Sequence, residues 1–183
     1  MTGFDIDIPN LYPEIYEHLL EYEKDAKARD DQGRNWYNLR ACSYYDEFDK
    51  TKIIWPDIAT EPSFTIVSRE YYLNNTAYIL TTDKNLYYIL GILNSKLLKW
   101  FYPLISTDLG KNGSRYIMQF IENIPIPAIT PSNSNAAARI EELVKKIINV
   151  PSNAVSLAAE EEINKIVYTL FDLTDDEIQV ING

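Results

Sequence analysis

The 183-residue sequence has a single cysteine, Cys42, and a single histidine, His18. One thiol cannot form a disulfide within the chain, and without paired Cys and His spacings there is no recognisable zinc motif. The first residues lack a basic segment followed by an apolar run, and no stretch reaches the roughly 18 uninterrupted apolar residues of a membrane helix. We therefore expect a cytoplasmic chain with no structural metal and no contact with a membrane.

Motifs for metal-dependent or nucleophilic catalysis are also missing. A nuclease of the Pro-Asp…Glu-x-Lys type needs a lysine close to its carboxylates, but Pro56-Asp57 is followed by Glu61-Pro62-Ser63. An amino-methyltransferase would need a Gly-rich cofactor turn and an Asn-Pro-Pro-Tyr loop for a flipped base, and neither is present. No nucleophile accompanies His18, and Cys42 is most simply a packed residue. The sequence therefore predicts a chain that is not itself an enzyme.

The composition that is present describes a folded chain. Apolar residues make up 46% of it, with 14 Tyr, 6 Phe and 3 Trp, which suits one domain with a hydrophobic core and a possible helical appendage. The net charge of −10 opposes simple binding to nucleic acid, because that affinity rests largely on Lys and Arg. The charge is uneven, however: residues 1–83 carry 8 basic and 16 acidic side chains, residues 84–123 carry 5 and 2, and residues 139–183 carry 4 and 9. Only the middle of the chain is basic.

Hydrophobic periodicity predicts an α/β (α+β) fold, in which a small mixed β-sheet packs against amphipathic helices and a helical tail follows. One helix is expected over residues 13–30, ended by a left-handed Gly33. The main core helix is expected over residues 83–102, with Thr82 or Asp83 as its N-cap and Pro103 helping to end it.

Short strands are predicted over residues 52–55, 64–68 and 76–82. Asn74-Asn75, between the last two strands, suggests a hairpin turn. Residues 128–135, rich in Pro, Ser and Asn, have the composition of a linker. Two amphipathic helices are expected beyond it, and Thr174 to Glu177 has the capping-box pattern that opens a last short helix.

Five blocks of sequence follow one another in a familiar order and spacing. They are Tyr12 to Arg40, Lys52 to Ala59, Tyr72 to Thr76, Leu90 to Leu97 and Gln119 to Pro127, and the tail adds Glu162 to Ile178. Together they resemble the TaqI-like C-terminal specificity (target recognition) domain of type II restriction-modification adenine methyltransferases. No single block is diagnostic, and the resemblance depends on their common register.

The resemblance implies sequence-specific recognition of double-stranded DNA. Together with the linker that composition predicts at residues 128–135, it gives a specificity domain at residues 1–127 and a helical tail module at residues 136–183. In that family an adenine-N6 methyltransferase domain, sometimes with an endonuclease, precedes the specificity domain on one polypeptide. We therefore expect this chain to be a fragment without the catalytic domain and without a cofactor of its own. S-adenosylmethionine and the methyltransferase domain as a partner are implied for the parent chain.

The loop over residues 110–116 is the first candidate for DNA contact, because recognition needs contacts to both phosphates and base edges. Lys111 and Arg115 suit phosphate or guanine, Asn112 suits adenine, and Ser114 suits either kind of contact. Tyr116 completes this loop. The alternative is a loop that is basic without a function.

The second candidate is the segment from Arg34 to Arg40, where aromatic residues alternate with hydrogen-bond donors. Arg34, Asn38 and Arg40 are the predicted DNA contacts here, whereas Trp36 and Leu39 are expected to be core residues that anchor the segment. Lys96 and Lys99 could reach phosphate from the polar side of the core helix, although a solvated helix face explains them equally well.

Three functions remain open on sequence grounds. The first is DNA target recognition, with weak and salt-sensitive binding by the isolated chain. The second is a protein-interaction module that docks the catalytic domain or another subunit and touches DNA only incidentally. The third is a stand-alone enzyme, which the missing catalytic motifs oppose.

Overall fold

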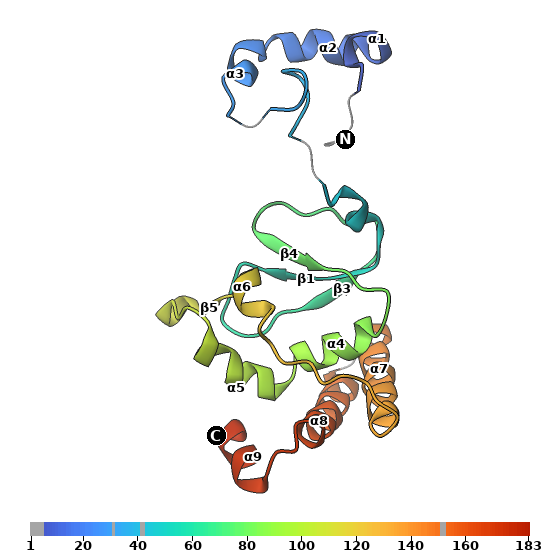
Figure 1. The fold of residues 1–183 in the computed structure, drawn as a ribbon, viewed down its shortest axis with the longest axis vertical. Coiled ribbons are helices and arrows are strands. Elements are labelled where there is room, and N and C mark those ends of the chain that lie inside the picture. The colour runs from blue at the N-terminus through green and yellow to red at the C-terminus, as the bar shows by residue number, and fades with distance from the viewer. Residues whose placement is uncertain (1–5, 31, 41–42, 151–152) are drawn as a thin grey trace. The chain divides into compact units, whose positions relative to one another are not determined.

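The computed structural model describes residues 6–30, 32–40, 43–150 and 153–183, and it divides into two compact units, Met1–Asp49 and Lys50–Gly183 (Figure 1). The fold is α/β, as the periodicity predicts, with helices and two small sheets. Within the described ranges, no helix is long and apolar enough to cross a membrane. No group of three or more His, Cys, Asp or Glu side chains in these ranges is arranged to hold a metal ion. Cys42, the expected packed cysteine, lies outside them.

The described part of the first unit contains short helices. They are α1 (Ile8–Leu11), α2 (Pro13–Leu20), α3 (Glu23–Lys27) and the 3₁₀ helix η1 (Tyr45–Asp49). The single helix expected over residues 13–30 is therefore interrupted, because the backbone N–H groups of Glu21 and Tyr22 bond three residues back instead of four. Gly33 does not adopt the left-handed conformation of a helix cap.

A three-stranded antiparallel sheet organises the second unit, with the strand order β3-β1-β4. The strands are β1 (Lys52–Pro56), β3 (Thr65–Val67) and β4 (Ala77–Leu80). In the central strand, Ile53 and Trp55 are 0% and 2% exposed, and the Trp55 indole stacks on Tyr78 of β4 at 5.7 Å. The sheet therefore buries one aromatic face that continues into the rest of the core.

The predicted hairpin at Asn74-Asn75 is wrong. Strands β3 and β4 do not pair with each other, because each pairs with a different edge of β1. Asn74 instead closes a local turn, where its side-chain oxygen accepts hydrogen bonds from the backbone N–H and the hydroxyl of Thr76. The expected mixed sheet also differs from the structure, since every described strand pair is antiparallel. The connections between paired strands contain no crossover helix of the kind that parallel pairing requires.

The core helix expected over residues 83–102 is two helices, α4 (Leu86–Leu93) and α5 (Lys96–Ile105). The side-chain amide of Asn94 bonds both the N–H and the C=O of Phe64, while Ser95 caps α5 by accepting the N–H of Leu98. Helix α4 begins after Asn85, which replaces the expected caps. Pro103 lies inside α5 and does not end it, since a proline in a last turn removes only one N–H donor.

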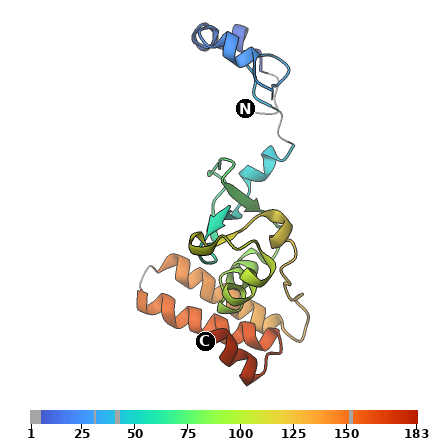
Figure 2. The same cartoon turned by 90° about the vertical axis from the view of Figure 1, so that its left-hand side faces the viewer.

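Helix α4 lies between the sheet and a pair of long antiparallel helices, α7 (Ser134–Asn149) and α8 (Asn153–Leu170) (Figures 1 and 2). The absence of a side chain at Gly91 permits this close packing. A Cβ atom there would lie only 2.5 Å from a methyl group of Ile140 and 3.1 Å from one of Val144. The α7–α8 pair therefore shares one hydrophobic core with α4 and the sheet.

The last two helices tie the tail to α5. The side-chain oxygen of the buried Asn164, on α8, accepts the backbone N–H of Lys96 at 2.8 Å, in the first turn of α5. Helix α9 (Asp175–Asn182) begins with the predicted capping box, because the side chains of Thr174 and Glu177 each accept the other's backbone N–H. Helix α7 begins at Ser134, inside the segment predicted to be a linker. The division into residues 1–127, 128–135 and 136–183 stays a prediction.

Candidate nucleic-acid interface

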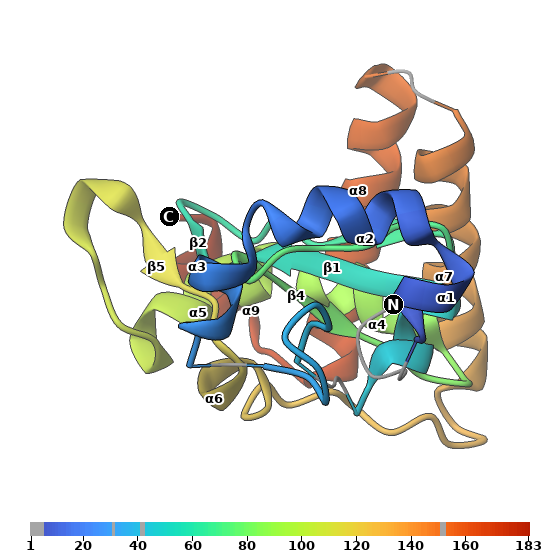
Figure 3. The ribbon, with the colours of Figure 1, turned by 90° about the horizontal axis from the view of Figure 1, so that it is seen from above.

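A two-stranded ribbon carries the first group of candidate residues. Strand β2 (Ile58–Ala59) pairs in antiparallel fashion with β5 (Ser114–Arg115), so that Ile58 lies opposite Arg115 (Figure 3). Gly113, which precedes β5, has φ +89°, and a Cβ atom there would lie 2.2 Å from the carbonyl oxygen of Ala59. Only glycine therefore lets the two strands of the ribbon approach at this end.

The loop that precedes β5 is closed by its own hydrogen bonds. The backbone N–H of Leu109 donates to the carbonyl of Gly113 at 2.8 Å, and the carboxylate of Asp108 accepts the N–H of Gly110 at 2.8 Å. The 3₁₀ helix η2 (Gly110–Asn112) forms the tip of this loop. Lys111 and Asn112 are exposed there, and neither side chain bonds to another described residue. The tip therefore presents one cation and one amide to solvent.

Tyr116 is a core residue that closes the base of the ribbon. It is 3% exposed, and its ring stacks on Tyr102 of α5 with 4.2 Å between the centroids and an interplanar angle of 6°. The edge of Phe64 completes its surroundings. Burial, together with the nearby negative charge of Glu61, raises the pKa of Tyr116 to about 12. Burial likewise raises the pKa of Tyr102.

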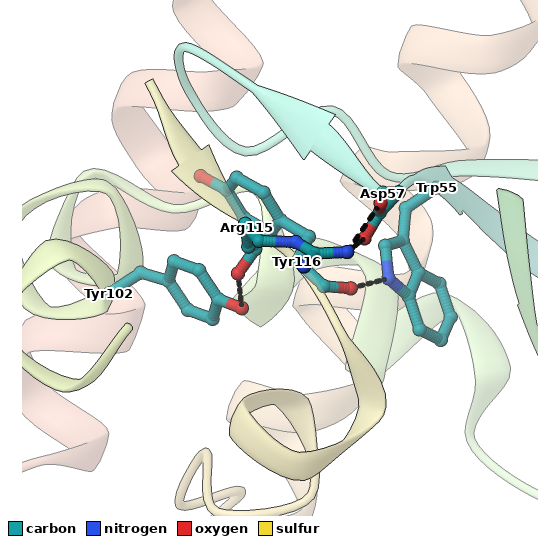
Figure 4. A network of polar contacts seen from close by, with 5 residues as sticks. All are labelled: Trp55, Asp57, Tyr102, Arg115 and Tyr116. Atoms are coloured by element: carbon teal, nitrogen blue, oxygen red, sulfur yellow. Dashed lines mark hydrogen bonds and ion pairs between the residues drawn. The ribbon is translucent and has the colours of Figure 1, made fainter. Parts of the chain in front are cut away.

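Hydrogen bonds from buried aromatic side chains fix the backbone on both sides of the Arg115–Tyr116 peptide (Figure 4). The Tyr102 hydroxyl donates to the carbonyl of Arg115 at 2.8 Å, and the Trp55 indole N–H donates to the carbonyl of Tyr116 at 2.7 Å. The backbone N–H of Tyr116 donates to the carbonyl of Asp57 at 2.7 Å. The end of the ribbon is therefore held rigidly against the core.

Arg115 forms an ion pair with Asp57 across the ribbon (Figure 4). Its Nη2 atom lies 2.9 Å from Oδ2 and 3.2 Å from Oδ1 of Asp57. The Arg115 side chain remains 43% exposed and that of Asp57 26% exposed. The Nε atom of Arg115 is buried and has no hydrogen-bond partner among the described residues. Ser114, the neighbour of Arg115 in β5, is 7% exposed.

The second group of candidates lies in a loop of the first unit. Arg34 and Arg40 are exposed, whereas Asn38 is 8% exposed and its side-chain oxygen accepts the backbone N–H of Asn35 at 3.1 Å. Asn38 therefore shapes this loop. Leu39 is 55% exposed, so its expected place in the core is wrong. Trp36 is half-buried, as part of a cluster with Tyr16 and Tyr37.

Arg29 and Gly33 hold this loop closed, and neither role is apparent from the local sequence. The guanidinium of Arg29 donates to the carbonyls of Trp36 and Asn38 at 2.8 and 3.1 Å. Gly33 permits the chain to pass close to itself, because a Cβ atom there would lie 2.5 Å from the carbonyl oxygen of Leu39. Arg29 and Gly33 both belong to the block from Tyr12 to Arg40, and both help to close the same loop.

Comparison with known proteins identifies the family. The TaqI-like C-terminal specificity domain matches residues 2–126, which is more than half of the chain. The chain belongs to this family. It is also similar to the type II methyltransferase M.BanIII of Aneurinibacillus aneurinilyticus, with 26% identity over 167 residues that cover 87% of this chain and 28% of M.BanIII. The type II methyltransferase M.MjaIV of Methanocaldococcus jannaschii is 25% identical over 148 residues, which cover 75% of this chain and 48% of M.MjaIV.

Among solved structures, this specificity domain has the fold of part of the type IIL restriction-modification enzyme MmeI, which was determined in complex with DNA. The TM-score is 0.64 at 16% identity, over 91% of this chain and 26% of MmeI. The chain thus spans between about a quarter and a half of the length of these proteins.

The matching family model is that of a specificity domain. The structure divides the predicted DNA contacts into two sets. The specificity domain brings Lys111, Asn112, Ser114, Arg115 and Tyr116 together on one ribbon. It gathers Arg34, Asn38 and Arg40 in one loop of the first unit. Their contacts with DNA stay predictions.

Lys96 and Lys99 are engaged elsewhere in this specificity domain. Lys99 pairs with Glu61, and the ammonium of Lys96 lies 3.5 Å from the side-chain oxygen of Asn182 on α9. Contact with phosphate would therefore require each lysine to leave a partner within the chain.

Sequence reasoning missed Asp57 and Tyr102 as parts of the ribbon. In the sequence, Asp57 stands out only as part of an incomplete nuclease motif, and Tyr102 only as a residue inside the helix expected over residues 83–102. The available signal was the position of Asp57 in the block from Lys52 to Ala59. That block contains strand β1 of the sheet and strand β2 of the ribbon, and Asp57 lies between them. Nothing in the local sequence indicates that Asp57 meets Arg115, because the two residues are 58 positions apart in the chain.

Proposed function

We propose that this specificity domain recognises a short sequence of double-stranded DNA on behalf of an adenine-N6 methyltransferase. The observation that carries the proposal is the ribbon β2–β5 with its exposed tip. Lys111 and Asn112 project from a loop whose base is fixed to the aromatic core, in the only basic part of the sequence. A two-stranded ribbon is one of the two elements that fit the major groove of B-form DNA.

In this proposal, exposed and buried candidates have different roles. Lys111 neutralises a phosphate and Asn112 can donate to and accept from adenine in the groove. Ser114 and Tyr116 are buried and set the shape of the ribbon, as Asn38 does for the loop that exposes Arg34 and Arg40. The acidic ends of the chain add little attraction to phosphate, so binding by this chain alone is weak and sensitive to salt.

Methyl transfer itself belongs to a catalytic domain of a longer parent chain in this proposal, and S-adenosylmethionine binds there. The described residues do not fit that cofactor. Gly110 and Gly113 lie in a loop that leads into an antiparallel ribbon. The Gly-rich turns that bind nucleotide cofactors instead connect a parallel strand to a helix.

The methyltransferase domain of the parent is also the proposed protein partner. Within the first unit, helices α1, α2 and α3 bury none of their residues, and Leu11 and Ile15 are 63% and 52% exposed. An apolar face of this kind marks a site of association. This observation also supports the second candidate function, an interaction module whose contact with DNA is incidental.

A chimera tests the proposed function. The segment of M.BanIII that matches this chain is replaced by residues 1–183, and the methylated DNA motif is read by sequencing that detects N6-methyladenine. We expect a motif different from that of M.BanIII. A chimera with Lys111→Ala and Asn112→Ala should show lower or relaxed methylation.

An active chimera that keeps the M.BanIII motif would contradict the proposal. Undiminished DNA affinity and methylation after Lys111→Ala and Arg115→Ala together would favour the interaction module instead.

A further inference from the structure

The ion pair between Arg115 and Asp57 helps to decide whether Arg115 contacts a DNA phosphate or a guanine base, the two contacts that its sequence position allows. One nitrogen, Nη2, meets both carboxylate oxygens of Asp57, at 2.9 and 3.2 Å. Nη1 bonds to no acceptor in the described part of the chain, and the Arg115 side chain is 43% exposed. Asp57 therefore holds the guanidinium through Nη2, and Nη1 remains available to bind a ligand.

Neutralisation by Asp57 makes Arg115 a poor contact for phosphate. Binding to the DNA backbone gains most of its free energy from counterion release, which depends on net positive charge brought to the phosphates. The pair of Arg115 and Asp57 brings none, because the carboxylate remains 2.9 Å from the guanidinium. Lys111, which has no anionic partner among the described residues, is the better phosphate contact.

Rigidity favours a directional contact instead. The backbone around Arg115 is fixed by Tyr102 and Trp55, and the side chain is oriented by Asp57, so little conformational freedom remains to be lost on binding. An oriented guanidinium matches two neighbouring acceptors, and guanine presents O6 and N7 side by side in the major groove.

We propose that Arg115 reads a guanine at one position of the DNA target and that Asp57 is its positioning residue. Asp57 also lowers the affinity for unrelated DNA, because it cancels the charge of Arg115. Only a site with guanine at this position offsets that loss, through its hydrogen bonds to the guanidinium. This inference rests on the proposed function and names the base that part of the ribbon recognises.

The experiment compares variants of the full chain with a pool of duplexes that carry a randomised central segment. Bound duplexes are sequenced for base preference, and affinity for a scrambled duplex is measured by fluorescence anisotropy over a series of salt concentrations. The variants are Asp57→Asn, Asp57→Glu and Arg115→Lys. Glu61→Gln is the matched control, because it also removes one acidic charge, that of the exposed pair with Lys99, and Glu61 forms no ion pair with Arg115 among the described residues.

The expected results differ between the variants. The wild-type chain prefers guanine at one position by about tenfold or more, and Asp57→Asn loses that preference. Asp57→Asn also binds the scrambled duplex more tightly, with a salt slope steeper by about one unit. Arg115→Lys loses the preference because an ammonium cannot reproduce the planar fork. Asp57→Glu keeps the carboxylate and retains part of the preference. Glu61→Gln keeps the full guanine preference, even though the loss of one acidic charge raises its affinity for the scrambled duplex.

Several outcomes would overturn the inference. One is a guanine preference that persists in Asp57→Asn or in Arg115→Lys, and another is an equal loss in Glu61→Gln. Thermal unfolding of each variant is recorded, and if Asp57→Asn does not fold, Arg115→Lys decides the result. A wild-type chain that binds the pool with no preference at any position overturns the proposed function as well. A clear base preference that is unchanged in the Asp57 and Arg115 variants overturns this inference but leaves the proposed function standing.

Discussion

Lys111 is the exposed cation at the tip of the β2–β5 ribbon. We predict that Lys111→Ala weakens binding to all duplexes by a similar factor and reduces the slope of log affinity against log salt by about one, as expected for the loss of one phosphate contact. Fluorescence anisotropy over a salt series measures both quantities. Lys146→Ala, which removes an exposed lysine from helix α7, is the matched control. An equal effect of the two substitutions would mean that general charge accounts for binding.

Tyr116 provides a test of the ribbon's buried base. Its folded-state pKa of about 12 exceeds the ordinary value of 10.0, so the unfolded chain releases this proton first as the pH rises. The stabilising contribution is complete below pH 10 and is lost between about pH 10 and pH 12, with a total on the order of 2–3 kcal/mol. Urea unfolding over this pH range should show the loss. It should be smaller in Tyr116→Phe, which removes no hydrogen bond within the described residues.

Tyr116→Phe also separates this tyrosine from the others of the chain. If it loses stability over the same pH range as steeply as the wild type, other groups are responsible.

At the residue scale, sequence alone predicted the kinds of side chain that the ribbon exposes but not which of them would be buried. Lys111 and Asn112 are in the predicted loop and are exposed. Ser114 and Tyr116 belong to the same run of residues but face the core, because alternate positions and an aromatic stack decide their burial. The partner of Arg115 comes from a distant part of the chain, and such pairs depend on the tertiary fold.

Helix α9 begins with the capping box of Thr174 and Glu177. We predict that Thr174→Ala lowers the free energy of unfolding by about 1 kcal/mol, since an N–H in the first turn loses its acceptor. Urea unfolding at neutral pH measures the change. Asp176→Asn lies in the same turn without a capping bond, so its effect should be smaller. Equal effects would show that charge near the helix dipole, and not the cap, provides the stability.

The same box gives a pH dependence. Hydrogen bonds from the backbone and then the hydroxyl of Thr174 lower the pKa of Glu177. The contribution is therefore present above the ordinary glutamate pKa and is lost as the pH falls through the depressed value. Thr174→Ala should reduce this acid sensitivity without abolishing it, because the hydroxyl donor is lost while the backbone N–H still donates to Glu177.

The element-scale predictions were correct where local sequence decides the structure. The capping box and the two tail helices follow from side chains a few residues apart, and both are confirmed. The predicted core helix was wrong in its continuity because Asn94 bonds to Phe64, thirty positions earlier in the chain. Pairing of β3 and β4 with β1 depends equally on contacts between distant segments, which a turn signal such as Asn74-Asn75 cannot reveal.

At the scale of the whole molecule, the two units differ in what they bury. The buried hydrophobic core lies in residues 50–183, whereas Asn38 is the one buried residue among the described positions of the first unit. We predict that a chain of residues 50–183 unfolds cooperatively at nearly the wild-type temperature, which differential scanning calorimetry measures. The first unit by itself should show no cooperative transition. A large drop in the unfolding temperature of residues 50–183 would mean that the first unit stabilises the second.

The contact of Asn164 with the first turn of α5 has a consequence for how such proteins diversify. Genes that acquire a new recognition specificity by recombination exchange contiguous stretches of coding sequence. A crossover after residue 127 would separate α5 from the amide that accepts its N–H at Lys96, and would separate Gly91 from the helix that fits against it. A crossover beyond α9 keeps both contacts. The exchangeable piece of this protein therefore includes its tail, even though the ribbon that meets DNA in our proposal ends well before it.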